Sequence, residues 1–138
     1  MSAETQTIIA VRSALVADTD LITLLGGVKV YDQTAPQDAV MPYVVLGRCA
    51  LSENDFDQGS AFECVLDIHA WSTQRARIEA NNIMERVRDV LHRSETLTIS
   101  GYGVSGVQET FSEVMIDPDN ITRHGVQSFQ IFFEPLGS

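Results

Sequence analysis

The glycine-rich run in the last third of the chain is the first candidate for chemistry. Gly101-Tyr102-Gly103-Val104-Ser105-Gly106 spells G-x-G-x-x-G, a pattern in which glycines and a helix N-terminus hold the pyrophosphate of a dinucleotide. That site needs a strand before the glycines and a helix after them. Here a strand-like run follows, from Val107 to Ile116. We therefore predict a bulge or bend in a strand rather than a nucleotide site.

Three histidines are the next candidates, and they lie far apart in the sequence. His69 falls in a strand-like run, His92 at the end of a helical stretch and His124 beyond a turn, beside Arg123. A cationic His92 would suit a helix C-terminus, and His124 would suit an interface. No Cys or Ser stands at a spacing typical of nucleophilic catalysis. We predict no catalytic residues and no enzyme activity, with a site that assembles only in the fold as the alternative.

Loop acids could in principle bind calcium. Asp55 and Asp57 lie in one polar segment, and Asp117 and Asp119 in another. Neither pair is followed by the remaining ligands of an EF-hand loop, and aspartate is a common turn former. We interpret these acids as turn residues.

Two cysteines, Cys49 and Cys64, lie in strand-like runs on either side of a polar loop. They can face each other across a hairpin as small buried side chains. Two cysteines without a histidine at ligand spacing do not make a zinc site. The sequence therefore predicts no metal and no cofactor.

The bulk properties describe one acidic globular domain. A length of 138 residues suits a single domain over 1–138. Nine basic and nineteen acidic side chains give a formal charge of −10, which argues against wrapping nucleic acid or binding an anionic membrane. The charge serves solubility, or it forms an acidic wall past which DNA moves without adhering. Residues 1–25 show no basic leader, and Asp18 and Asp20 interrupt the apolar run, so we expect a cytoplasmic protein with reduced cysteines.

Helical periodicity appears in three places. Apolar residues recur at helical spacing over 5–17, and Asp18-Thr19-Asp20 can cap a second short helix that Gly26-Gly27 ends. The clearest helix covers about 74–92, capped by Ser72 or Thr73. We expect its polar side chains to form a solvated face: Arg75, Arg77, Glu79, Glu85, Arg86 and Arg88.

Strand patterns surround the long helix. We expect strands at 28–31, 43–50, 62–71, 97–99, 107–116 and 122–134, with a hairpin loop over 54–60 and an Asp-Pro turn at Asp117-Pro118. In 62–71 one face is apolar, whereas the face with His69 and Trp71 mixes polar and apolar groups and should be only partly covered. The order of elements predicts an α+β fold, a mostly antiparallel sheet with N-terminal helices and one long central helix packed on it.

Several segments, taken in order, resemble a known family. They are 24–28, Val30-Tyr31-Asp32, Ala35-Pro36-Gln37, 42–47, His69-Ala70-Trp71-Ser72, Asp117-Pro118-Asp119 and 122–126. Together they resemble the tail-terminator, or tail-completion, proteins of long-tailed phages and phage-like gene transfer agents. The match covers nearly the whole chain.

The resemblance implies a structural protein assembled in the host cytoplasm and carried in the particle at the head-proximal end of the tail. It implies a ring of identical copies, usually six, that ends the tail tube, binds the tube protein and the head–tail connector, and lets DNA pass without sequence-specific contact. For the interfaces we single out residues on the mixed strand face and at the two loop tips: Asp55, Asp57, His69, Trp71, Asp117, Asp119, Arg123 and His124. The alternatives are a head-completion protein of the same particle and a small ligand-binding domain or enzyme.

Overall fold

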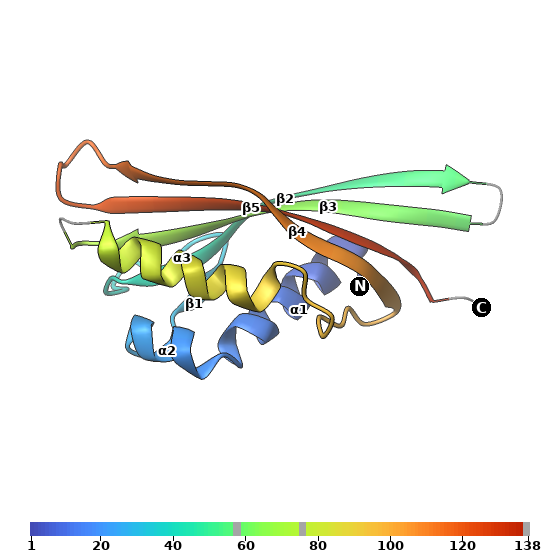
Figure 1. Cartoon of the computed structure of the whole chain (residues 1–138), viewed down its shortest axis with the longest axis horizontal. Helices are drawn as coiled ribbons and strands as arrows, with labels where there is room; N and C mark the ends of the chain where they lie inside the picture. The colour runs from blue at the N-terminus through green and yellow to red at the C-terminus, as the bar shows by residue number, and fades with distance from the viewer. Residues whose placement is uncertain (57–58, 75–76, 137–138) are drawn as a thin grey trace.

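The computed structural model describes residues 1–56, 59–74 and 77–136, except for the side chains of 54–56 and 59. The chain forms α1 (Ala3–Val16), α2 (Thr19–Leu25), β1 (Val30–Asp32), β2 (Tyr43–Phe56), β3 (Gly59–Ser72), α3 (Ile78–Leu91), β4 (Tyr102–Ile116) and β5 (Arg123–Pro135). The five strands make one sheet in the order β1-β2-β3-β5-β4, in which only the β1–β2 pair is parallel. The predicted α+β fold with a mostly antiparallel sheet is confirmed (Figure 1).

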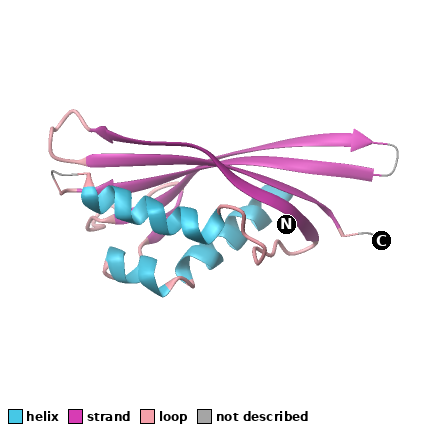
Figure 2. Ribbon diagram, in the orientation of Figure 1, coloured by secondary structure: helices cyan, strands magenta, loops and turns pink. Residues whose placement is uncertain are grey.

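All three helices lie on one face of the sheet, and the opposite face is left open (Figure 2). The distal end of the β2–β3 hairpin projects beyond the helices at one end of the sheet, and the β4–β5 turn lies at the other end (Figure 1). Among the described residues, no helix combines the length and the apolar character needed to cross a membrane.

Helix α1 begins two residues before the predicted start at residue 5, whereas α2 is capped and ended by the residues that the sequence predicts. The Ser2 hydroxyl accepts a hydrogen bond from the Thr5 N–H at 3.0 Å, and the Asp18 carboxylate accepts one from the Leu21 N–H at 2.9 Å. Both are N-caps, which satisfy backbone donors that the first helical turn leaves free. Gly26, with φ of 77°, ends α2 in the left-handed conformation that glycine adopts without strain.

The core lies between the helices and the covered face of the sheet. Alternate residues of β3 and β5 are fully buried there: Cys64, Leu66, Ile68, Phe129, Ile131 and Phe133. Helices α1 and α3 supply the opposing layer through Val11, Leu15, Ile83, Val87 and Leu91. Burial of each large apolar side chain contributes about 1.5–3 kcal/mol.

Helix α3 is also tied to the sheet by polar contacts and a close approach. Buried Gln127 donates to the Met84 carbonyl at 2.9 Å and to Glu109 at 2.8 Å, and Glu109 pairs with Arg88 at 3.1 Å. At Gly125 an added Cβ would overlap the sulfur of Met84. Glycine at this position therefore leaves room for the Met84 side chain of α3 to pack on β5.

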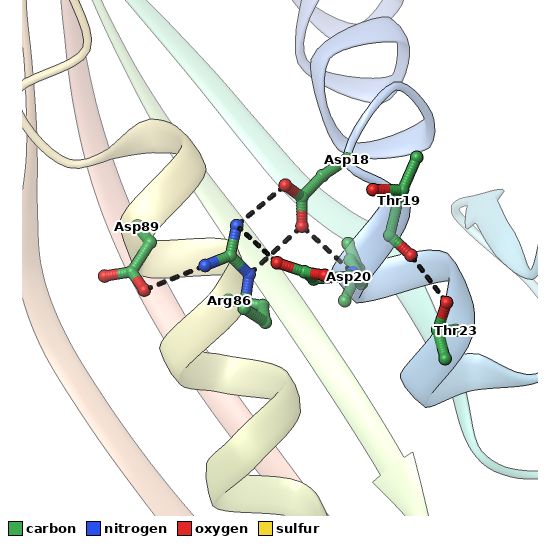
Figure 3. A network of polar contacts seen from close by, with 7 residues as sticks. Asp18, Thr19, Asp20, Thr23, Arg86 and Asp89 are labelled. Carbon is green, nitrogen blue, oxygen red and sulfur yellow. Dashed lines mark hydrogen bonds and ion pairs between the residues drawn. The ribbon is translucent and has the colours of Figure 1, made fainter.

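Arg86 joins α3 to α2 (Figure 3). Its guanidinium donates to both oxygens of Asp18, at 2.7 and 3.1 Å, and to Asp89 at 3.3 Å. The hydrogen bond from Arg86 is the main reason why the pKa of Asp18 lies below its ordinary value. Asp18 thus caps α2 and anchors α3 with the same carboxylate. The prediction of a wholly solvated arginine face is wrong for Arg86.

Several predicted boundaries need correction. Residues 97–99 form no strand, and Leu97 and Ile99 are buried in a loop under the sheet. The predicted cap of α3 is also wrong, because Ser72 ends β3, and its hydroxyl accepts from the Gln74 N–H and donates to Glu79. The hairpin loop predicted over 54–60 is shorter, because β2 continues to Phe56 and β3 begins at Gly59. After Gly101, which lies in the preceding turn, the glycine run forms the start of β4, with a register shift between Val104 and Gly106, as the bulge prediction expected.

Candidate functional site

The open face of the sheet is the part of the molecule best placed to meet a partner. Strand alternation puts one row of each strand there, and on β3 and β5 these rows are only partly buried: residues 63, 65, 67, 69 and 71, and 124, 126, 128, 130 and 132. On β4 the large side chains Phe111 and Met115 are 50% and 38% exposed. The sequence prediction of a partly covered mixed face is confirmed.

Three of the predicted interface residues come together on this face. The register pairs Trp71 with His124 and His69 with Val126, so the two histidines are diagonal neighbours on adjacent strands. His69 Nδ1 lies 2.6 Å from His124 Nε2. The His124 ring stacks on Trp71 with centroids 3.8 Å apart and planes 9° from parallel. We call His69, Trp71 and His124 the histidine–tryptophan cluster.

Both histidines of this cluster are neutral at neutral pH. Burial lowers the pKa of His69 below its ordinary value of 6.5, although Asp67 opposes that change. Burial also lowers the pKa of His124, and His69 adds to the effect. Since a hydrogen bond between two imidazoles needs one nitrogen without a proton, protonation of both rings would break it.

A pocket of about 480 Å³ adjoins the histidine–tryptophan cluster. The loop from Gln33 to Gln37 forms one side, and Tyr43, Val45 and the cluster itself complete the lining. Its lining also carries the hydroxyls of Thr34 and Tyr43 and the side-chain amides of Gln33 and Gln37. The pocket can accept aromatic, amide or proline groups.

The remaining candidates are distributed along the sheet. Asp119 shapes the β4–β5 turn by accepting from the Ile121 and Thr122 N–H groups at 2.9 and 2.8 Å, as a turn former should. Asp117 begins that turn, its carbonyl accepting from the Asn120 N–H at 2.9 Å. Arg123 is buried on the helix-covered face and donates to the Ile121 carbonyl. It therefore offers a partner little surface.

One predicted residue lies near the distal end of the β2–β3 hairpin. Asp55 pairs with Ser60 in the strand register, at the end of the sheet opposite the β4–β5 turn. Asp57 lies outside the described residues. The seven predicted residues that the structure describes thus divide into the cluster, the β4–β5 turn with its buried Arg123, and Asp55 near the end of the hairpin.

No three metal-ligating side chains converge within the described segments of the chain. The glycine-rich run gives no phosphate cradle either, because it continues as β4 and no helix follows it. Sequence reasoning did not identify Tyr43, Phe111 and Met115 as residues of the open face. Tyr43 is the first residue of β2, and the exposure of Phe111 and Met115 follows a second register shift, between Glu109 and Phe111.

Comparison with known proteins agrees with the resemblance that the sequence suggested. A family model described as tail completion protein gp17 matches residues 9–134. The fold is similar to a chain in the virion of a native gene transfer agent particle, with a TM-score of 0.82 and 22% identity over 91% of this chain and 92% of that one. It is also similar to the gp17 protein of bacteriophage SPP1, with a TM-score of 0.61 and 21% identity over 99% of this chain and 92% of that one.

At these identities the two solved structures establish a shared fold, whereas the family model spans most of the sequence. No curated protein sequence matched the chain. The residues that match the family model run from the middle of α1 to the end of β5. The chain therefore belongs to the tail completion protein gp17 family.

Proposed function

We propose that this protein is a structural assembly protein that forms a ring of six copies, ends the tail tube of a phage or gene transfer agent and joins it to the head connector. The match to the tail completion family over 9–134 carries the proposal. The ring is assembled in the host cytoplasm and stays at the head-proximal end of the tail, and DNA passes through it without specific contacts.

The form of the sheet supports a ring of identical copies. A closed ring needs two different surfaces on each copy, which meet head to tail. Strand β4 is one edge of the sheet along its whole length. At the other edge β1 pairs only with Val44 to Leu46, so the later part of β2 presents a second free edge. Free strand edges carry backbone groups ready to pair with another chain, which makes these two edges natural partners between neighbouring copies.

Apolar surface near β4 supports the same arrangement. Phe111, Met115, Ile116 and Ile121 are all at least 38% exposed and lie on β4 or in the turn that follows it. Exposed apolar side chains grouped in one region are typical of interaction surfaces. Permanent subunit interfaces often bury more than about 2,000 Å² in total. The open face, with the histidine–tryptophan cluster and its pocket, adds area for contact with a neighbouring copy, the tube or the connector.

Charge constrains how the copies are placed. Six copies at −10 each carry −60. At physiological salt, charges more than about 8 Å apart are largely screened, so acids spread around the bore and rim are compatible with a closed ring. An acidic bore would also keep DNA from adhering. A ring whose bore is lined by arginines would contradict this part of the proposal.

Binding to separated particle parts tests the function. Purified protein is mixed with tail tubes and, separately, with DNA-filled heads, and bound protein is located by electron microscopy. We expect caps on one end of the tubes. Binding to filled heads but not to tubes would favour a head-completion protein instead.

The enzyme or ligand-binding alternative has one observation in its favour, the pocket beside His69 and His124. Substitution of both histidines by Gln separates the possibilities. Normal tail assembly together with loss of small-molecule binding by the purified protein would favour the alternative.

A further inference from the structure

Two thiols lie in contact at the root of the projecting hairpin. Cys49 on β2 pairs with Leu66 and Cys64 on β3 pairs with Leu51, so the two cysteines are diagonal neighbours on the covered face. Their sulfur atoms are 2.9 Å apart, and both are free thiols. A disulfide needs a sulfur–sulfur distance of about 2.05 Å, so closing the bond asks for less than 1 Å of movement.

The two thiols differ in access and in acidity. Cys49 is half-buried and borders a pocket of about 550 Å³ that Glu4, Ile8 and Arg48 also line, whereas Cys64 has no exposed surface. The hydrogen bond from Cys64 lowers the pKa of Cys49, against burial and the nearby Glu4 and Asp32 carboxylates. The same hydrogen bond, together with burial, raises the pKa of Cys64. Cys49 is thus both the accessible thiol and the one more easily ionised, and the thiolate is the reactive form.

We propose that Cys49 and Cys64 form an oxidation site that closes to an intrachain disulfide, with a low-molecular-weight disulfide such as oxidised glutathione as the oxidant. Cys49, as the thiolate, attacks one sulfur of the oxidant, the sulfur–sulfur bond of the oxidant breaks, and one small thiolate leaves. Cys64 then attacks the sulfur of Cys49 and displaces the second small thiolate, which takes up the proton of Cys64 and leaves as a thiol. Two protein thiols are oxidised and one small disulfide is reduced to two thiols.

The disulfide would restrain the end of the β2–β3 hairpin that projects beyond the helices. It would join β2 to β3 where Phe62 stacks on Phe133 at 5.5 Å and meets Tyr102 edge-on at 5.8 Å. The tip of the hairpin would then lie in a closed covalent loop between positions 49 and 64, and its two strands could not separate at the root. A glutathione-buffered cytosol holds such a pair as thiols, and it closes where the proportion of oxidised glutathione is higher.

The test uses the full chain, reduced and then incubated with oxidised glutathione under native conditions. Samples are trapped at intervals with a maleimide and analysed by intact mass and by peptide mapping without reductant. We expect a transient glutathione adduct on Cys49, then loss of both free thiols, a mass two hydrogens below that of the reduced chain, and a peptide linking Cys49 to Cys64. The oxidised protein should melt several degrees above the reduced protein.

Single substitutions assign the two roles. C64S should stop at a stable glutathione adduct on Cys49, and in C49S the buried Cys64 should stay unmodified until the protein unfolds. Circular dichroism and gel filtration verify that each variant is folded, and if either is not, the order of events in the trapped wild type decides. Two thiols that persist, a first adduct on Cys64, or disulfides only between chains would overturn the proposal.

Discussion

His69 and His124 show how two residues far apart in the sequence become one chemical unit. Their strands are neighbours only because β5 inserts between β3 and β4 in the sheet. The sequence predicted that each histidine belongs to an interface, from its place on a mixed strand face or beside a turn. It could not predict their 2.6 Å contact or the stacking on Trp71, because both depend on the β3–β5 register.

The folding stability of the protein should depend on pH through His69 and His124. Both pKa values are depressed in the folded protein, by burial first of all, so the unfolded chain takes up protons at higher pH than the folded chain. Stability from this source is complete above 6.5, the ordinary histidine value, and is lost as the pH falls from there toward the depressed values. H124F keeps a ring on Trp71 but cannot titrate, so its urea midpoint should fall less than that of the wild type between pH 7.5 and pH 5.5. Equal losses in both proteins would exclude the pair as the source.

Substitutions at the contact between α2 and α3 should lower stability in proportion to the interactions that each one removes. R86A removes a partly buried two-point hydrogen bond to Asp18 and should lower the free energy of unfolding by about 1–2 kcal/mol. D18A also removes the N-cap of α2 and should cost about 1 kcal/mol more. R77A, at an exposed arginine of the same helix region, should change stability by less than about 0.5 kcal/mol. Urea denaturation measures all three, and an R77A effect as large as that of R86A would contradict the assignment.

Among the helices and strands, sequence periodicity predicts the element correctly where one of its faces is buried. The core row of β3 and the central residues of α3 follow directly from alternation and helical spacing. The run 97–99 was misread because Leu97 and Ile99 alternate like a strand, but they fill the core from a loop that has no strand partner. Arg88 is 54% exposed, as the sequence predicts, although it pairs with Glu109 on β4. The partner of Arg86 is Asp18, which precedes α2, and helical spacing alone does not reveal it.

Substitution by alanine should affect stability much more at Phe129 on β5 than at Phe111 on β4. Phe129 on β5 is fully buried, whereas Phe111 on β4 is 50% exposed on the open face. F129A should lower the free energy of unfolding by about 3–5 kcal/mol, and F111A should change it by less than about 0.5–1 kcal/mol. Chemical denaturation compares the two, and similar losses would show that the open face is buried in the monomer.

Because Met84 on α3 packs against Gly125 on β5, substitutions at these two positions should have coupled effects on stability. G125A places a methyl group against the sulfur of Met84 and should destabilise the protein by about 1–3 kcal/mol through overpacking. In a protein that already carries M84A, the same substitution should cost much less, because the space is free. A double-mutant cycle measures this coupling, and additive effects would contradict the packing described for α3.

At the scale of the whole molecule, the family and the fold class could be predicted from the ordered motifs and the sequence of elements. Three other features could not be predicted from the sequence, because they depend on which strands become neighbours. They are the uncovered sheet face, the short β1 edge and the contact between the two thiols. Membership of the tail completion family and a sheet with two free edges and one open face together support assembly from identical copies. The assigned role depends on the proposed ring at the end of the tail tube.

Electron micrographs of particles produced without this protein test that role most directly, with particles from the complemented strain as the control. We expect tails of uncontrolled, excessive length or tails detached from heads, and restoration of normal particles by the wild-type chain. Normal particles with joined heads and tails of ordinary length in the absence of the protein would contradict that role.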